Sequence, residues 1–317
     1  MFFKNLMKWM IMLTIMISIS SNNWFIFWIM MEMNMLVFIP ILKMNKMENC
    51  NSMISYFIIQ SFSSILFFMG SSMMLINSFL VNEILINISL MIKLAMIPFH
   101  SWLILISETL DFNSFMIILT VQKMIPLFIL DKMKSSITFL VSILSITWSS
   151  IMIFNLKLFK KILIFSSISH LSWMIIIMFS YSNFWMFYMI IYSYMIFSIT
   201  KILKKMKINS IESLMKLKSN DKISIIILFL SLGGIPPFIG FIIKFLAIMI
   251  IIKYSIICMI ILILSSLINI FIYMRMITPS MMMFNKLNIN FNIKKLMKNF
   301  ILSMTVIFTF FMINMIL

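Results

Sequence analysis

Almost the whole chain divides into apolar runs near the length that crosses a lipid bilayer. A helix needs about 20 consecutive apolar residues to cross the hydrocarbon core. In lipid, backbone polar groups must be paired within such a helix or around a closed barrel. Because the runs show no regular alternation of polar and apolar residues, they are not barrel strands. The sequence therefore predicts an all-α polytopic membrane protein.

Eleven spans are predicted, and two of them contain interruptions. The ninth span includes the stretch SLGGIPPFIGFIIKFLA at 231–247, which holds three of the chain's four glycines and two adjacent prolines. It is therefore predicted to form two half-helices, and the fourth span is predicted to be interrupted at Pro98. The eleven spans are 5–21, 23–42, 53–77, 84–106, 112–130, 136–155, 162–180, 184–203, 222–252, 255–277 and 299–317.

The basic residues indicate how the spans are oriented. The chain is 63% hydrophobic and only 10% charged, with a net charge of +17. With the N-terminus inside, 19 of the 25 lysines and arginines fall on the inner side and 3 on the outer side. This asymmetry is typical of membrane topology. A nucleic-acid surface would gather the charge in one patch, whereas here it is scattered over separate loops.

Four charged residues lie inside apolar spans: Glu32 in the second, Lys93 in the fourth, Lys123 in the fifth and Lys244 in the ninth. Each costs roughly 3 kcal/mol at mid-bilayer if unpaired. Structural ion pairs are the alternative interpretation, but one glutamate cannot neutralise three lysines. A lysine removed from water can also bind and release a proton. The pattern therefore favours a proton relay.

The remaining candidate side chains carry weaker signals. His100 follows Lys93 by seven residues, and His170 lies mid-span among serines, where it is either a proton carrier or a satisfied core residue. Cys50 and Cys258 are interpreted as free thiols, and no Cys/His cluster has metal-ligand spacing. The absence of a GxGxxG motif and of a cysteine cluster indicates no cofactor in this chain.

The two interruptions occupy matching places in a predicted internal repeat. Residues 1–131 form a first five-helix unit and 132–280 a second, with 281–317 as a loop and C-terminal helix. Because five is odd, the second unit is inverted relative to the first. Broken helices 4 and 9 at equivalent places in inverted repeats indicate the ion site of a transporter.

Five motifs stand out along the chain: EMN at 32–34 with FIP at 38–40, KLAMIPFHSW at 93–102, VQKMIP at 121–126, SSISHLSW at 166–173 and GGIPPFIGFIIK at 233–244. In this order they resemble motifs of the NADH dehydrogenase subunit 2 family of respiratory complex I. Ile104 and Leu105 stand where the family has Pro-Glu. The high content of Met and Phe, 39 and 33 residues, also indicates an A/T-biased genome such as an organelle's.

This resemblance implies an antiporter-like, proton-translocating subunit of the mitochondrial inner membrane. It implies an N-terminus on the matrix side and a C-terminus in the intermembrane space. Glu32 and Lys93 are expected to form a switching pair, Lys123 the central relay and Lys244 the second-half site.

The resemblance also implies which molecules surround the chain. NADH, FMN, iron–sulfur clusters and ubiquinone are expected in other subunits. The expected partners are neighbouring antiporter-like and small membrane-arm subunits and the lipid bilayer, with no nucleic acid. A free-standing cation/proton antiporter and a structural scaffold with inert ion pairs are the alternatives.

Overall fold

The computed structural model describes residues 2–42, 48–74, 79–180, 182–215 and 219–282. Within these residues the chain is helical, and its only β-type pairing is an isolated antiparallel bridge between Leu158 and Ser210. The all-α prediction is confirmed. The eleventh predicted span, 299–317, and the predicted segment 281–317, apart from its first two residues, lie outside the described residues.

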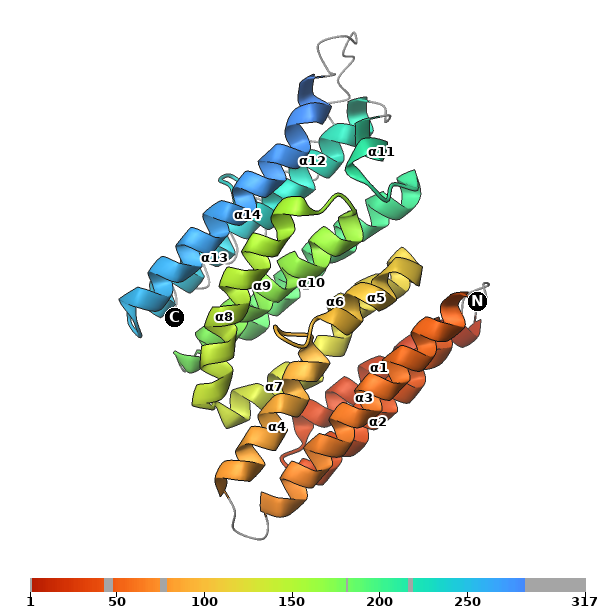
Figure 1. Cartoon of the computed structure of the whole chain (residues 1–317), viewed down its shortest axis with the longest axis vertical. Coiled ribbons are helices and arrows are strands. Elements are labelled where there is room, and N and C mark those ends of the chain that lie inside the picture. The colour runs from red at the N-terminus through yellow and green to blue at the C-terminus, as the bar shows by residue number, and fades with distance from the viewer. Residues whose placement is uncertain (1, 43–47, 75–78, 181, 216–218, 283–317) are drawn as a thin grey trace.

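The helices run side by side and alternate in direction, so that successive connections fall at opposite ends of the molecule (Figure 1). Ten predicted spans have helical counterparts. In the first half these are α1 (Phe2–Ser20), α2 (Trp24–Leu42), α3 (Glu48–Met73), α4 (Phe79–Leu94) with α5 (Ser101–Thr109), and α6 (Phe112–Leu119) with the 3₁₀ turn η2 (Val121–Lys123) and α7 (Met124–Met133).

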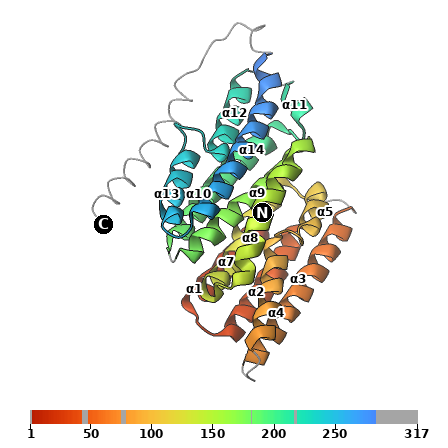
Figure 2. The ribbon, with the colours of Figure 1, turned by 60° about the vertical axis from the view of Figure 1, so that its left-hand side comes forward.

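The second half lies beside the first, with its helices running in a similar direction (Figures 1 and 2). Its elements are α8 (Ser136–Met152) with the 3₁₀ turn η3 (Ile153–Asn155), α9 (Phe159–Phe179), α10 (Phe184–Met206), the short α11 (Ile211–Met215), α12 (Ser219–Gly233) with α13 (Ile239–Ile252), and α14 (Ile256–Met282).

Seven stretches of the described chain are helical, apolar and long enough to cross a membrane. Two shorter apolar helices, Asn5–Ser20 and Ile239–Ile252, accompany them. The multi-pass prediction therefore agrees with the structure. The seven stretches are Trp24–Leu42, Cys50–Met73, Phe112–Met133, Ser136–Asn155, Phe159–Phe179, Phe184–Met206 and Ile256–Pro279.

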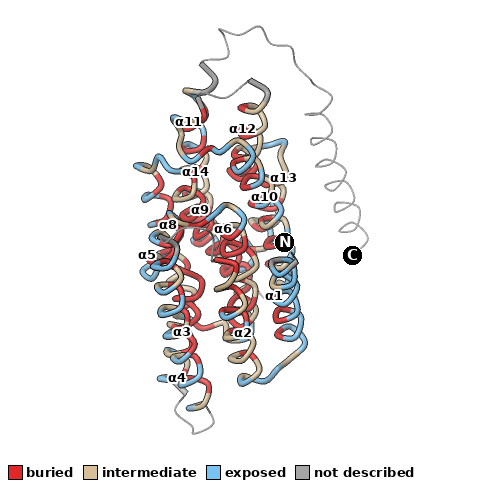
Figure 3. The backbone as a smooth tube through the Cα atoms, turned by 90° about the vertical axis from the view of Figure 1, so that its right-hand side faces the viewer, coloured by how far each residue is buried: buried red, intermediate tan, exposed pale blue. Residues whose placement is uncertain are grey.

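Helix α9 is the central element, because every residue from Ile162 to Met178 is buried. It packs against helices of both halves, including α5, α7, α8, α10 and α13. Exposed residues gather instead on outer helices such as α1 (Figure 3). Small hydroxyl residues within α9 allow neighbouring helices to approach closely, as is usual where helices associate in a bilayer.

Both predicted interruptions are present, and a third was not predicted. The chain leaves helical geometry between α4 and α5, between α12 and α13, and also at Thr120, between α6 and η2. Thr120 adopts φ −120° and ψ −77°, outside the helical region. Pro126 supplies the physical reason, because it has no N–H to donate to the carbonyl of Gln122. That proline was the sequence signal that the fifth predicted span, 112–130, is not one continuous helix.

Candidate functional site

Three buried lysines lie at the three helix interruptions, one at each. Lys93 is the penultimate residue of α4, and the left-handed Ala95 (φ 55°) directly follows the helix end. Lys123 is the last residue of η2, and Lys244 lies in the second turn of α13. They are 8%, 2% and 8% exposed, respectively. We refer to these three side chains as the lysine row.

Lys93 is held by the backbone of α3. Its Nζ donates to the carbonyl oxygen of Gln60 at 3.4 Å. The same helix end is supported by Trp102, whose indole N–H donates to the carbonyl of Ile92 at 3.1 Å. Interruption of a helix leaves carbonyls without their usual helical partners, and here the Ile92 carbonyl accepts from both the Ala95 N–H and the Trp102 side chain of α5.

Glu32 is near Lys93 but does not contact it. Its carboxylate accepts a hydrogen bond from the hydroxyl of Ser64. Lys93 lies within electrostatic range of Glu32, although no ion pair between them exists among the described residues. The expected switching pair is therefore separated in this conformation, and its role stays a prediction.

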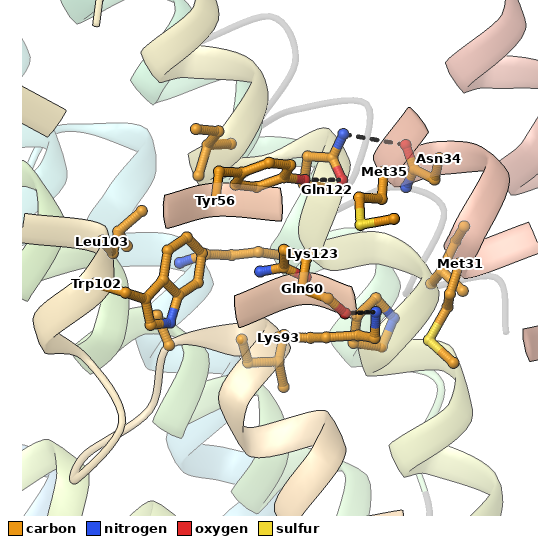
Figure 4. A pocket seen from close by; sticks show the side chains of 15 residues that line it. Met31, Asn34, Met35, Tyr56, Gln60, Lys93, Trp102, Leu103, Gln122 and Lys123 are labelled. Carbon is orange, nitrogen blue, oxygen red and sulfur yellow. Dashed lines mark hydrogen bonds between the residues drawn. The ribbon is translucent and has the colours of Figure 1, made fainter. Parts of the chain in front are cut away.

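A small cavity joins Lys93 to Lys123 (Figure 4). The cavity volume is about 20 Å³, enough for about one water molecule. On its wall, the Gln122 amide nitrogen donates to Asn34 Oδ1 at 3.0 Å, and the Tyr56 hydroxyl approaches Gln122 Oε1 at 3.5 Å. Polar side chains from three helices therefore share the wall of this cavity with apolar ones, and both lysines line it.

Lys123 is bound by a residue that the sequence did not single out. Its Nζ donates to the hydroxyl of Ser167 at 3.0 Å. Ser167 in turn donates to the carbonyl of Ile164 at 2.6 Å, so its oxygen is oriented to accept from the lysine. The available signal was a serine three residues before a predicted site histidine, in a serine-containing stretch of an apolar span.

Lys244 binds the broken end of the preceding half-helix. Its Nζ donates to the carbonyl of Gly233 at 2.6 Å and approaches that of Leu232 at 3.4 Å. These are the last carbonyls of α12, the negative end of the helix dipole. Gly234 makes the turn possible, because its φ of +84° is unfavourable for residues with a Cβ.

The two histidines occupy different surroundings. His170 is 3% exposed, its Nδ1 lies 2.9 Å from the Tyr188 hydroxyl, and it is within electrostatic range of both Lys123 and Lys244. His100 is half-buried in the first interruption, where its Nδ1 lies 3.2 Å from the Pro98 carbonyl. His170 is thus within electrostatic range of two lysines of the row, whereas among the described residues no hydrogen bond or ion pair links His100 to the row.

Neutral oxygens hold the lysine row throughout. The ion pairs found among the described residues are Lys134–Asp131 at 3.4 Å and Lys161–Glu108 at 2.6 Å, and neither includes a lysine of the row. A lysine bound to a neutral acceptor can lose its proton without leaving an unpaired carboxylate behind. The arrangement is thus suited to reversible proton binding.

Family comparison covers most of the chain. A sequence model of the transmembrane NADH:quinone oxidoreductase/Mrp antiporter family matches residues 21–269. A protein named NADH-ubiquinone oxidoreductase chain 2 from Rhipicephalus sanguineus is 46% identical over 98% of this chain and 99% of its own length. The Anopheles gambiae protein of the same name is 35% identical over 77% of this chain and 75% of its own.

Solved structures share the fold. A chain of respiratory complex I from Thermus thermophilus aligns with a TM-score of 0.80 at 18% identity, over 88% of this chain and 71% of its own. A chain of the Mrp complex from Dietzia sp. DQ12-45-1b aligns with a TM-score of 0.73 at 13% identity, over 84% of this chain and 58% of its own. The helical arrangement is therefore common to both assemblies.

Proposed function

Because the chain belongs to the NADH-ubiquinone oxidoreductase chain 2 family, we propose that it is a membrane-arm subunit that translocates protons in an NADH:ubiquinone oxidoreductase of the mitochondrial inner membrane. The high identity to the Rhipicephalus sanguineus protein across the full length favours this role over that of a free-standing cation/proton antiporter.

One observation carries the proposal: each of the three helix interruptions holds a buried lysine that contacts no carboxylate among the described residues. A purely structural ion pair needs its counter-ion in contact, whereas a proton carrier needs an acceptor that tolerates both protonation states. The carbonyls of Gln60 and Gly233 and the hydroxyl of Ser167 are such acceptors.

The proton moves along the lysine row in steps. Glu32 biases Lys93 electrostatically, and a water in the shared cavity passes the proton between Lys93 and Lys123. His170 lies within electrostatic range of Lys123 and Lys244, so it links the row across α9. Protonation of one member disfavours protonation of the next, because like charges repel in a low dielectric. This repulsion drives the proton onward.

The rest of the assembly supplies the energy. NADH, FMN, iron–sulfur clusters and ubiquinone act in other subunits, and neighbouring antiporter-like and small membrane subunits surround this one. Residues 1–131 and 132–280 act as inverted five-helix units, each with its fourth helix broken at a lysine. The N-terminus faces the matrix, in keeping with the lysine-rich connections.

Replacement of Lys123 by Met tests this function. The variant keeps a long side chain but cannot carry a proton, so the ratio of protons pumped to NADH oxidised in the reconstituted assembly should fall. Lys253→Met, at an exposed position just after α13, is the matched control and should leave the ratio unchanged.

Two outcomes separate the alternatives. If Lys123→Met pumps normally, the lysines are structural and the proposal is wrong. If the chain is purified as an active cation/proton exchanger without a flavin-containing partner, it is a free-standing antiporter.

A further inference from the structure

A stripe of buried hydroxyl groups runs along α8. Its members are spaced by three or four residues and therefore share one helix face. Each is at most 3% exposed, and from first to last they extend over about 21 Å of helix axis, most of a hydrocarbon core of about 30 Å. We refer to them as the hydroxyl stripe: Ser135, Thr138, Ser142, Ser145 and Ser149.

The stripe is connected to the surroundings of the lysine row. The hydroxyls of Ser145 and Ser172 lie 2.6 Å apart, which joins α8 to α9. One turn before Ser172, Ser169 accepts a hydrogen bond from the Asn269 amide of α14 at 3.3 Å. On α9, the same run of hydroxyls includes Ser167, which accepts the hydrogen bond from Lys123 Nζ, so the stripe meets the helix that binds the central lysine.

An unpaired acceptor on α14, beside Ser169, points to water as a ligand. Asn269 is 4% exposed, and its Oδ1 has no hydrogen-bond donor among the described residues. A buried amide oxygen is costly to leave unpaired. Ser142 and Ser145 donate to carbonyls of their own helix, at 2.6 and 2.9 Å, so their oxygens stay free to accept.

We propose that the hydroxyl stripe is the route by which protons leave the lysine row towards the end of the molecule that holds Ser135. This inference rests on the proposed function. Each hydroxyl accepts a proton on its oxygen and releases its own hydrogen to the next water or hydroxyl, so no group is consumed. The lysine distribution predicts that Ser135 lies on the intermembrane-space side.

Close helix packing is the competing explanation, since small residues let membrane helices approach each other. The two roles make different demands on the side chain. Packing requires only small volume, which alanine retains. Proton conduction requires the hydroxyl oxygen, which alanine lacks.

Proton pumping by variants of the intact assembly distinguishes these roles. Ser145→Ala should lower the ratio of protons pumped to NADH oxidised as far as Lys123→Met does. Thr147→Ala is the matched control, because Thr147 lies on the same helix, faces outward and donates only within α8. It should leave the ratio unchanged.

The outcomes also separate this inference from the proposed function. If Lys123→Met lowers pumping while Ser145→Ala does not, the exit route is wrong and the lysine relay stands. If neither variant lowers pumping, the relay itself is wrong.

Cysteine labelling gives an independent measurement that needs no pumping defect. Ser142→Cys should react with a membrane-impermeant methanethiosulfonate added on the Ser135 side during NADH oxidation, as quantified by mass spectrometry of this chain. Leu171→Cys, at a fully buried position in α9, is the baseline. A Ser142→Cys thiol that reacts no faster than this baseline, or only from the opposite side, overturns the proposal.

Discussion

Ser167 helps to position the central lysine, because its hydroxyl accepts the hydrogen bond from Lys123 Nζ. Ser167→Ala should lower proton pumping about fivefold, the rate equivalent of one hydrogen bond worth about 1 kcal/mol. The measurement is the initial rate of proton accumulation in vesicles, divided by the rate of NADH oxidation.

A control serine lies on the neighbouring helix. The Ser198 hydroxyl donates to the Met195 carbonyl of its own helix, α10, at 2.8 Å. Ser198→Ala should therefore pump normally. Equal pumping by the Ser167 and Ser198 variants would show that Lys123 needs no hydroxyl acceptor.

At the residue scale, charged positions were predictable and their partners were not. Lys93, Lys123 and Lys244 stand out because an apolar run contains few charges. Their partners are main-chain carbonyls or a common serine, on helices distant in sequence or across a turn. Neither group has a sequence signature, because every residue has a carbonyl and serine is abundant here.

At the element scale, two of the three interruptions were predictable from prolines within apolar runs, one of them beside glycines. The GGIPP stretch and Pro98 predicted two of them correctly. The third, beside Lys123, has only Pro126 as a signal, and proline is also common in the first turn of an unbroken helix. Only the structure therefore shows that the helix stops at Thr120.

Gly234→Ala tests how the second interruption is held. A Cβ at this left-handed residue (φ +84°) would lie 2.8 Å from Cδ of Lys244. Left-handed geometry costs a residue with a Cβ about 1–2 kcal/mol, and the contact would displace the lysine from Gly233. We expect a lower temperature of dissociation of this subunit from the solubilised assembly, together with reduced pumping.

The adjacent glycine provides the comparison. A Cβ on Gly233 would meet the Tyr273 ring at 3.2 Å, and Gly233 ends α12 without positive φ. Gly233→Ala should therefore lower the dissociation temperature less. If it proves the more harmful change, side-chain crowding rather than backbone geometry limits this turn.

At the scale of the whole molecule, Lys160 forms hydrogen bonds between the two halves. From the first turn of α9 its Nζ donates to the carbonyl of Ser107 at 3.0 Å and to that of Leu110, both at the end of α5. Hydrogen bonds to a charged donor contribute about 1.5–3 kcal/mol, and partial exposure reduces this. Lys160→Met should therefore shorten the half-life of the solubilised subunit at elevated temperature.

Lys157 serves as the control for this prediction, because it is exposed in the connection just before α9. Lys157→Met should leave the half-life unchanged. Equal half-lives for both variants would mean that the apolar contact between α5 and α9 suffices.

The hydropathy of the sequence does not indicate that α9 is the central helix. The most apolar windows of α2, α8 and α9 all have a mean hydropathy of 2.0, yet 39%, 39% and 94% of these windows are buried. Lipid and protein interior select the same apolar side chains. Hydropathy therefore predicts that a helix crosses the membrane but not whether its neighbours are lipids or other helices.

The burial of α9 has a consequence for biosynthesis. Its serines and His170 find their partners on α8, α10 and α14, and α13 completes the enclosure. The ribosome makes α13 and α14 only after α9 has already emerged. Until then, the polar face of α9 needs protection by the insertion machinery. Ribosomes stalled before residue 239 should therefore leave α9 crosslinkable to that machinery, and the full-length chain released from the ribosome should not be crosslinked to it.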